Sequence, residues 1–485
     1  MDGSYREDVS RARRGRRHVC HASVRAPAER HAHSPARRPI CSVDASEQTP
    51  LAPDIGPIAG VDRIGPICGV RPDSTGQRRL DILVAAWGHV GSRADWTVVS
   101  DRIEILFLID YFQRIGGTEK HLAQLICGLP ETFRCSVVAF DLGANPLVDD
   151  LRARGVAVVH LPVGREYVPN AALQAWRLSR MIRRNRYDIV QTFHQKADTY
   201  GALVAWLSGA RHLVSSKRDT GDLRKPLHVF LNRRLKWLFE AFIMVAEAVR
   251  VAVMANDRLP ASRVTIIYNG VDLKRFAVPS IEQRNEARKR FGFAAEDFVV
   301  GMIAAFRPEK DHGAFFEALS QAAGAIPSLK VLVVGEGPLL SHFRQRIAAT
   351  ALGSRTLFTG EVADVLPCLW SMDVGCLTPS GNEGFSNAVV EQMAVGLPMI
   401  VTDVGGNAEA VADGVNGYVV QPQDIPALAR AVVTLYVDPA RTIAMARASR
   451  QRAEERFSLE RMCSGHARLY LSLCRRDEGL PGRGH

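Results

Sequence analysis

The chain has 485 residues, of which 47% are hydrophobic and 23% charged, and both values are typical of globular proteins. A single hydrophobic core stops growing at roughly 250–300 residues, so the length predicts at least two domains. No run of about 20 uninterrupted apolar residues is present, which argues against a membrane-spanning helix. The nine cysteines show no pairing or metal-binding spacing, so we expect a reduced, cytoplasmic protein.

The net charge of +11 is concentrated in the middle of the chain. Residues 102–278 carry 26 basic and 16 acidic side chains, whereas residues 279–485 carry 21 and 23. Residues 1–101 carry 15 and 12, with arginine clusters scattered among Pro, Ala, His and Gly. This segment lacks a sustained period, so we expect a disordered or weakly ordered basic extension. An arm that contacts nucleic acid or anionic lipid is the alternative.

From residue 102 onward, short apolar segments alternate with helical patterns. Strands are predicted at 103–109, 137–140, 156–161 and 189–193, and helices around 118–126 and at 146–154 and 171–184. After the turn at Asn269-Gly270 a second series begins, with strands at 298–303, 329–334, 356–358, 374–377 and 399–402 and helices at 313–322, 339–349 and 387–394. Such alternation is typical of parallel α/β sheets.

The predicted fold class is therefore α/β, with two Rossmann-like, doubly wound domains that face each other across a cleft. We expect an N-terminal domain at 102–278, completed by a C-terminal helix at 459–475, and a C-terminal domain at 279–458. Ligands in such sheets bind at the carboxyl ends of the strands. The cleft between the two domains is the expected site.

The most informative stretch is residues 378–391, in which a loop of small residues follows a buried strand and precedes a helix. Ser386 or Asn387 is placed to cap this helix. Its free backbone N–H groups would suit a diphosphate. Glu391 could accept hydrogen bonds from the two hydroxyls of a ribose, and Glu383 could address a transferred sugar. By spacing alone, a charged surface pair near a helix start explains the two glutamates equally well.

The wider context resembles the GT-B glycosyltransferases of group 1 (family 4), from about Glu104 to about Tyr470. The spacing of Glu383 and Glu391 matches the best-known motif of this family. The other matches follow in the family's order: Gly116-Gly117-Thr118-Glu119, 188–194, Asn269-Gly270-Val271-Asp272, 307–312, Gly335-Glu336-Gly337-Pro338, Gly360-Glu361, 402–409 and 413–417.

This resemblance implies a retaining glycosyltransferase that takes a sugar from a nucleotide-sugar donor. It implies Glu383, Lys310 and His194 as catalytic residues, with Lys310 binding the diphosphate. The donor-binding residues that it implies are Gly116, Gly117, Arg307, Gly335, Glu336, Gly384, Phe385, Ser386, Asn387 and Glu391. No Asp-x-Asp run is present, so we expect neither a metal nor another cofactor. Glu361 and Glu409 are candidates for surface or supporting positions.

One position departs from the family pattern. Where the family usually has an arginine, this chain has Ala305, two residues before Arg307. Arg307 could reach the diphosphate instead. If it does not, one of two cations is missing, and such a loss can cost roughly 10²–10³ in rate. The chain could then be a non-catalytic partner of an active transferase. A sugar-nucleotide epimerase is a weaker alternative, because the Glu383–Glu391 loop does not match one.

The acceptor is expected on the N-terminal domain. A basic stretch from Arg211 to Lys236 precedes the apolar residues Trp237, Leu238, Phe239 and Phe242. Exposed aromatics beside basic residues would indicate an interfacial helix on an anionic membrane, and hence a carbohydrate or lipid-linked acceptor at the inner face. A charged surface next to an ordinary core helix is the alternative. No nucleic-acid partner is expected, because no recognised motif accompanies the basic arm.

Overall fold

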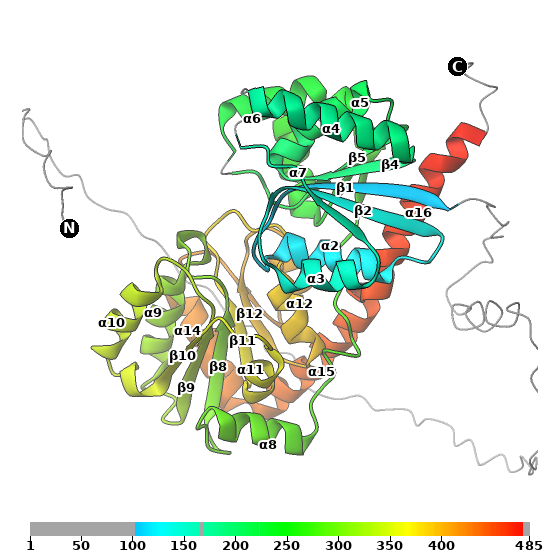
Figure 1. Cartoon of the computed structure of the whole chain (residues 1–485). Coiled ribbons are helices and arrows are strands. Elements are labelled where there is room, and N and C mark those ends of the chain that lie inside the picture. Colours follow the sequence, from blue (N-terminus) through cyan, green and yellow to red (C-terminus); the bar gives the residue numbers. More distant parts are fainter. Residues whose placement is uncertain (1–101, 165–168, 223, 479–485) are drawn as a thin grey trace, which may run out of the picture. The chain divides into compact units, whose positions relative to one another are not determined.

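The computed structural model describes residues 102–164, 169–222 and 224–478, all of which belong to one compact unit of the chain. The prediction for the basic extension at 1–101 lies outside the described residues. Two parallel sheets, each with its own helices, follow one another along this unit (Figure 1).

The first sheet has seven strands in the order β3-β2-β1-β4-β5-β6-β7, and all neighbours are parallel. The strands are β1 (Ile103–Phe112), β2 (Phe133–Leu142), β3 (Ala157–His160), β4 (Ile189–Phe193), β5 (His212–Lys217), β6 (Ala241–Met244) and β7 (Val264–Ile266). The order reverses between β1 and β4. In a sheet of this kind, the crevice at such a reversal is the usual ligand site.

Strand β1 carries a continuous apolar run from Ile105 to Ile109 because helices cover both of its faces. Ile105 and Phe107 belong to a core with α2 (Gly117–Gly128) and α3 (Pro146–Ala153), whereas Leu106 and Leu108 belong to a core with α4 (Pro169–Asn185) and α5 (Ala202–Leu207). This alternation follows the two-residue period of a strand. A continuous apolar run is what a strand of a doubly covered parallel sheet requires.

Helices connect the strands of the first sheet. They are α2 (Gly117–Gly128), α3 (Pro146–Ala153), α4 (Pro169–Asn185), α5 (Ala202–Leu207), α6 (Pro226–Leu235) and α7 (Glu247–Asp257), with a π-helical turn η1 (Ala197–Gly201) and 3₁₀ turns η2 (Lys236–Leu238) and η3 (Ala261–Arg263). Local sequence explains some of their ends. Asn145 caps α3 by accepting from the Leu147 N–H at 3.0 Å.

The second sheet has six parallel strands in the order β10-β9-β8-β11-β12-β13, with its reversal between β8 and β11. Its strands are β8 (Phe298–Ile303), β9 (Leu329–Val334), β10 (Thr356–Gly360), β11 (Val374–Leu377), β12 (Met399–Thr402) and β13 (Gly417–Val420). Its helices are α8 (Ile281–Arg290), α9 (His312–Ala322), α10 (Leu340–Ala348), α11 (Leu366–Ser371), α12 (Asn387–Ala394), α13 (Asn407–Ala410), α14 (Ile425–Val437) and α15 (Pro439–Arg456), with 3₁₀ turns η4 (Pro308–Lys310) and η5 (Gly353–Arg355).

The last helix, α16 (Leu459–Glu478), packs on the first sheet rather than on the second. The Tyr470 hydroxyl donates to Gln191 of β4 at 2.6 Å, and the rings of His466 and His121 lie 5.5 Å apart. The N-terminal domain therefore borrows part of its core from the end of the chain. None of the helices in the described ranges has the length and apolar character that crossing a bilayer requires.

The predicted fold class is confirmed: the chain folds into two Rossmann-like α/β domains. All nine predicted strands are present within about two residues of an observed strand, except that β1 and β2 extend further. Strands β5, β6, β7 and β13 were not predicted. Strand β5 reads His-Leu-Val-Ser-Ser-Lys, and its polar half is buried in the sheet, where Ser215 and Lys217 both donate to the Asp198 carboxylate of η1.

Candidate active site

Most of the predicted site residues lie where the two sheets reverse their order. In the first sheet, Gly116 and Gly117 follow β1 and His194 follows β4. In the second, Arg307 and Lys310 follow β8 and Glu383 follows β11. Because β1 neighbours β4 and β8 neighbours β11, each pair of loops opens at one crevice. Residues that lie far apart in the sequence are thus collected at two equivalent places.

The glycine loop after β1 ends at a helix start. Gly116 is the N-cap of α2 and has no side chain that could cap this 12-residue helix. The Glu119 carboxylate instead accepts from the Gly116 and Glu119 N–H groups, which leaves the N–H groups of Gly117 and Thr118 for a ligand. A Cβ on Gly116 would lie 2.4 Å from the Glu119 Oε2 atom. The Glu119 carboxylate therefore leaves no room for a side chain at residue 116. The start of α2 also provides backbone N–H donors for an anion.

Lys310 and Glu383 form an ion pair between the β8 and β11 loops. The Lys310 side chain is 22% exposed and that of Glu383 is 11% exposed. Lys310 closes the 3₁₀ turn η4, which begins at Pro308 and is followed by Asp311 in a left-handed conformation with φ of 49°. The turn places one cation and one carboxylate together at the reversal of the second sheet.

Helix α12 begins at Asn387, directly after this loop. Ser386 occupies the N-cap position, as predicted, but makes no side-chain capping bond. The Asn387 side chain instead donates to the Gly117 carbonyl at 3.1 Å and accepts from the Asn269 amide at 2.6 Å. The N–H groups at the start of α12 therefore keep no side-chain cap, and Asn387 joins the two glycine-containing loops.

Gly384 and Phe385 contribute to the site through their backbone atoms. A Cβ on Gly384 would lie 1.9 Å from the Arg218 carbonyl oxygen, so only glycine fits there. The Phe385 ring is 5% exposed and packs 5.2 Å from both Tyr268 and Phe457. The Phe385 side chain is thus part of the core, and the Phe385 carbonyl accepts from Asn269 at 3.0 Å.

Glu391 lies on α12 and is 7% exposed. Burial raises the pKa of its carboxyl group, and the Lys120 ammonium lowers it. The Lys120 Nζ atom lies 3.7 Å from Glu391 Oε1. Lys120 is therefore a residue of α2 that touches the predicted ribose-binding carboxylate, and it was not among the predicted site residues.

His194 ends β4 in a left-handed conformation with φ of 72°, which is uncommon for a residue other than glycine. Its Nε2 atom lies 3.3 Å from the Thr118 hydroxyl, and its Nδ1 atom is buried without a hydrogen-bond partner among the described residues. Burial lowers the pKa of His194 to about 4, so the ring is neutral at pH 7. A neutral imidazole can exchange hydrogen bonds with a sugar hydroxyl.

Gly335 and Glu336 follow β9, next to β8 in the sheet. Gly335 has φ of 144°, and a Cβ there would lie 2.1 Å from the Ala304 carbonyl oxygen. The Glu336 carbonyl accepts from the Phe306 N–H at 2.9 Å. These residues thus hold the backbone of the β8 loop in place, and the Glu336 side chain is exposed.

Two family models match this chain, one described as glycosyl transferases group 1 over residues 297–438 and one as glycosyltransferase family 4 over residues 115–275. A GDP-mannose-dependent monoacylated alpha-(1-6)-phosphatidylinositol monomannoside mannosyltransferase of Corynebacterium glutamicum is 31% identical over 276 residues, which are 55% of this chain and 67% of the relative. The chain belongs to glycosyltransferase family 4.

Other proteins are similar over longer or shorter parts of the chain. The UDP-Gal:alpha-D-GlcNAc-diphosphoundecaprenol alpha-1,3-galactosyltransferase of Escherichia coli is 26% identical over 310 residues, 61% of this chain and 78% of the relative. Among solved structures, HepE of Anabaena in complex with UDP superposes with a TM-score of 0.68 at 23% identity, and the match covers 76% of this chain and 100% of that one. The structural likeness shows the same fold.

Arg307 is the residue that the sequence offered in place of the family arginine absent at Ala305. Its side chain is 60% exposed, and its guanidinium lies 4.0 Å from Glu309. Arg307 therefore faces solvent and a carboxylate of its own turn. A more buried cation, Arg218, follows strand β5 of the first sheet.

Arg218, which follows β5, is a second residue that the sequence analysis did not assign to the site. Its Nη2 atom donates to Asn269 Oδ1 at 2.6 Å, and its Nη1 atom is buried without a partner among the described residues. Burial lowers the pKa of Arg218 to about 9, and Glu119 and Asp219 oppose this shift. A guanidinium that stays charged at pH 7 with one unused donor therefore lies beside the α12 start, which Asn269 also contacts.

Glu409 has a structural role between the domains. Its carboxylate accepts from the N–H groups of Glu247 and Ala248, both at 2.8 Å, and from the Tyr268 hydroxyl at 2.8 Å. Glu409 of α13 thus caps α7 of the first sheet. Glu361, the other undecided glutamate, is exposed.

The predicted interfacial helix at the end of the basic stretch is wrong in part. Leu238, Phe239 and Phe242 are 5%, 3% and 2% exposed and belong to the core, because the segment passes from η2 into the buried strand β6. Lys217 is also buried, in an ion pair with Asp198 at 2.7 Å. Only Trp237 of the predicted apolar residues is exposed, at 56%.

Proposed function

We propose that this family 4 member is a retaining hexosyltransferase that moves a sugar from a nucleoside-diphosphate sugar to a hydroxyl of a carbohydrate or lipid-linked acceptor. The observation that carries the proposal is that each of the two sheets reverses its strand order once and places predicted site residues at that reversal. One provides the glycine-containing start of α2 and a neutral His194, and the other provides the Lys310–Glu383 pair.

The donor diphosphate would bind where backbone donors and cations meet. The N-cap residues of α2 and α12, Gly116 and Ser386, make no side-chain capping bond, and Asn387 at the start of α12 donates to the Gly117 carbonyl at the start of α2. Helix starts favour anions through free N–H groups and the helix dipole. Glu391 would accept hydrogen bonds from the ribose hydroxyls and exchange its contact with Lys120 for them.

Two cations would stabilise the charge that develops on the departing diphosphate. Lys310 is the first, and Glu383 holds its ammonium in place. We assign Arg218 as the second, in the role that Ala305 leaves open, because its Nη1 atom has an unused donor near the start of α12. Fixed cations of this kind lower a transition-state barrier without reorganising during the reaction. The proposal needs no bridging metal.

Retention is proposed through front-side attack. The bond between the anomeric carbon and the diphosphate oxygen breaks, and its electron pair leaves with the nucleoside diphosphate. The acceptor oxygen then forms its bond on the same face, and its proton passes to the leaving oxygen. Double displacement would need a carboxylate free to act as a nucleophile. Glu383 is engaged by Lys310, so it does not meet this need. His194 would orient a hydroxyl of the transferred sugar.

Named relatives support a lipid-linked acceptor. The Escherichia coli relative is named for a diphosphoundecaprenol acceptor, and the Corynebacterium glutamicum relative for a phosphatidylinositol mannoside. The same two names specify UDP-Gal and GDP-mannose, so uracil and guanine are both candidates for the base of the donor nucleotide. The acceptor here would accordingly be a glycolipid or a polysaccharide precursor.

A thermal-shift panel tests the donor site without an acceptor. The full chain and the Glu391→Ala variant are heated with UDP, GDP and ADP and with their sugars. A ligand at about 100 times its dissociation constant adds about 2.7 kcal/mol to the free energy of unfolding. One nucleotide should raise the Tm of the wild type and not of the variant. Product stereochemistry by NMR then tests retention, and an inverted anomer contradicts the front-side mechanism.

A non-catalytic partner of an active transferase is the second candidate, and Ala305 is the observation that favours it. Such a partner would show no turnover of any nucleotide sugar. Binding of a nucleotide without turnover, with any acceptor tested, would favour this candidate over the enzyme.

A further inference from the structure

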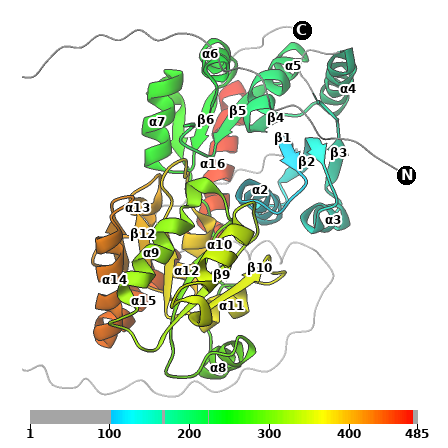
Figure 2. The same cartoon turned by 90° about the vertical axis from the view of Figure 1, so that its left-hand side faces the viewer.

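Exposed apolar side chains gather on one part of the N-terminal domain. Of the 16 large apolar side chains exposed in the described part of the chain, eight lie on α4, α5, α6 and η2. The three helices lie together at one end of this domain in both views (Figures 1 and 2). A concentration of this kind marks an interaction surface, whereas singly scattered apolar residues need no explanation.

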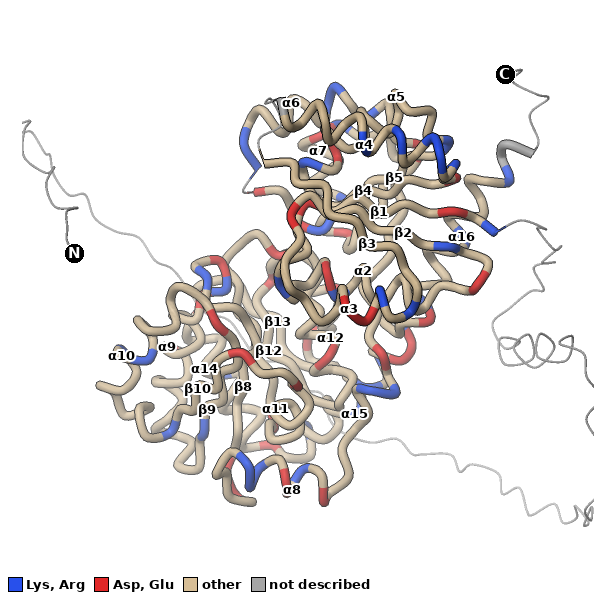
Figure 3. The backbone as a smooth tube through the Cα atoms, in the orientation of Figure 1, with Lys and Arg blue, Asp and Glu red and all other residues tan. Residues whose placement is uncertain are grey.

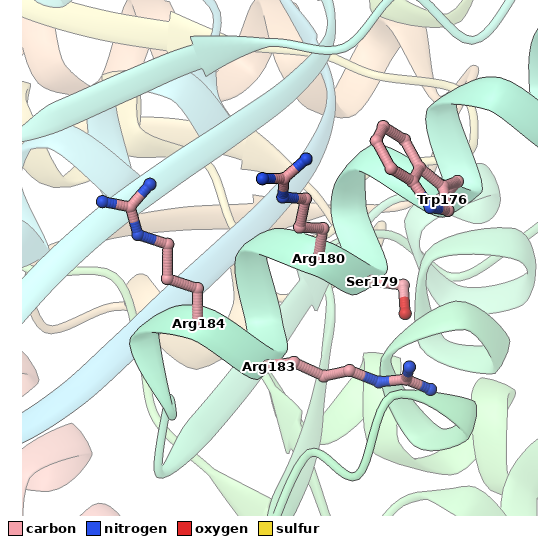
Figure 4. A pocket seen from close by; sticks show the side chains of 5 residues that line it. All are labelled: Trp176, Ser179, Arg180, Arg183 and Arg184. Carbon is pink, nitrogen blue, oxygen red and sulfur yellow. The ribbon is translucent and has the colours of Figure 1, made fainter.

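Helix α4 contributes one stripe. Leu173 and Trp176 are 47% and 57% exposed, and the Arg180 guanidinium lies 5.5 Å from the centre of the Trp176 ring. Steps of three and four residues place Leu173, Trp176, Arg180 and Arg184 on one side of the helix. Figure 4 shows Arg180 and Arg184 projecting on the same side of α4, along a surface depression of about 390 Å³.

Helix α6 and the turn η2 contribute a second stripe. Leu227, Phe230 and Trp237 are 56%, 52% and 56% exposed. Arg234 lies between the last two in sequence, and its guanidinium is 5.3 Å from the Phe230 ring. Steps of three or four residues again place these side chains on one side. Both stripes therefore combine apolar and basic side chains.

Helix α5 joins the two stripes. The rings of Trp206 and Trp237 meet edge to face with 5.0 Å between their centres. The Arg183 guanidinium of α4 donates to the Leu207 carbonyl at 3.4 Å. We call this continuous surface the α4–α6 face; its exposed aromatic residues are Trp176, Trp206, Phe230 and Trp237.

The charge of the α4–α6 face has a single sign. Helices α4, α5 and α6 and the turn η2 contain no Asp or Glu, and they contain seven Lys or Arg residues. Figure 3 shows these basic positions as blue segments that recur along α4. Tryptophan favours the boundary between lipid and water, and arginine beside it favours anionic head groups. An apolar protein partner would account for the aromatic residues but not for the excess of arginine.

We propose that the α4–α6 face docks the protein on the surface of an anionic lipid bilayer. The arginines contact head-group phosphates, and the aromatic rings enter the interface between head groups and acyl chains. This inference goes beyond the proposed function, because none of the residues of the donor site belongs to this face. It also replaces the interfacial helix that the sequence indicated, since Phe239 and Phe242 are buried while α4 and α5 supply exposed tryptophans.

Vesicle sedimentation tests the inference on the full chain. Vesicles of phosphatidylcholine alone are compared with vesicles that contain 30% phosphatidylglycerol. The wild type should bind the anionic vesicles and release them in high salt. The Arg180→Glu/Arg184→Glu variant should bind at least roughly 30-fold more weakly, because each basic residue near such a surface contributes about a factor of five. The Trp176→Ser/Trp237→Ser variant should also bind more weakly.

A matched control separates this face from general charge. Arg346 and Arg430 are exposed on the second sheet's helices, so Arg346→Glu/Arg430→Glu makes the same charge change elsewhere. The control should bind like the wild type. The basic extension is unchanged in every variant, so any binding through it is common to all. Nucleotide-induced thermal shifts, measured on the same proteins, should be the same in all variants and report the donor site independently.

Several results would overturn the inference. Equal vesicle binding by the Arg180→Glu/Arg184→Glu variant and the control would show that the α4–α6 face does not bind the membrane. Equal binding of the wild type to neutral and anionic vesicles would remove the role of the arginines. A dimer that the face variants dissociate, or nucleic-acid binding that they abolish, without vesicle binding by the wild type, would assign the face to another partner.

Discussion

Replacing Arg218 by glutamine removes the guanidinium and keeps an amide that can still donate to Asn269. In the folded chain, Arg218 donates one hydrogen bond to Asn269 at 2.6 Å and leaves its Nη1 atom buried and unpaired. Burial holds its pKa at about 9, so the group still carries its charge at pH 7. The folded chain thus keeps a partly desolvated cation whose second donor is unused in the free protein.

The size of the effect follows from the charge that this donor would meet. At 4 Å and an effective dielectric constant of about 20, a cation and an anion attract by about 4 kcal/mol. Removal of one fixed donor from a developing charge costs roughly 10²–10³ in kcat. We therefore expect Arg218→Gln to lower kcat by roughly 10²–10³. The Tm should not fall, because the substitution also removes the cost of burying a charge.

The assay is transfer by the purified full chain with the nucleotide sugar that the thermal-shift panel selects. Arg307→Gln serves as the matched control, because Arg307 is 60% exposed and should change kcat less than threefold. Adding Ala305→Arg to Arg218→Gln should restore part of the lost rate. If Arg218→Gln keeps kcat within threefold of the wild type while Arg307→Gln loses it, Arg307 is the second cation and the assignment of Arg218 is wrong.

Four further outcomes are expected. Glu391→Gln should weaken nucleotide binding roughly 10- to 100-fold in calorimetry, because it loses charged hydrogen bonds to the ribose. Gly384→Ala should lower the transfer rate by roughly 10²-fold, since its Cβ would lie 1.9 Å from the Arg218 carbonyl and must displace the loop. Excess EDTA should leave the transfer rate unchanged, and a loss that Mg²⁺ or Mn²⁺ restores would contradict the proposed role of the cations. Burial lowers the pKa of His466 to about 4. The folded chain thus favours the neutral ring, and the resulting stability is fully present above pH 6.5. It should be lost as the pH falls toward 4, by on the order of 3 kcal/mol in the free energy of unfolding. The Tm of His466→Leu should fall less than that of the wild type over this range.

Much of the site could be predicted because its residues follow strands. Gly117, His194, Lys310 and Glu383 lie in the segments that follow β1, β4, β8 and β11, and a parallel sheet brings the carboxyl ends of neighbouring strands to one edge. Recognising the strands and the type of sheet is then enough to bring these residues near one another. The same reasoning predicted the fold class without any knowledge of long-range contacts.

Side-chain direction was not available from the sequence in the same way. Phe385 lies within the predicted loop, yet its ring points into the core against Tyr268 and Phe457. Arg218 counted only as one more charge in a basic stretch. Its burial depends on Asn269, which lies 51 residues further along the chain, and on Gly384 of the other sheet. Neither partner is indicated by the local pattern around Arg218.

Glu409 shows where such long-range partners leave a local trace. Helix α7 begins after Ala246, whose side chain offers no capping oxygen, and yet the first N–H groups of this helix are satisfied. The carboxylate that satisfies them comes from α13, 162 residues beyond Glu247. A helix start without a Ser, Thr, Asp or Asn at its cap needs a partner from elsewhere, since an unpaired N–H is costly away from water. The missing cap at Ala246 therefore predicts that some acceptor docks there, and only the folded structure identifies it as Glu409.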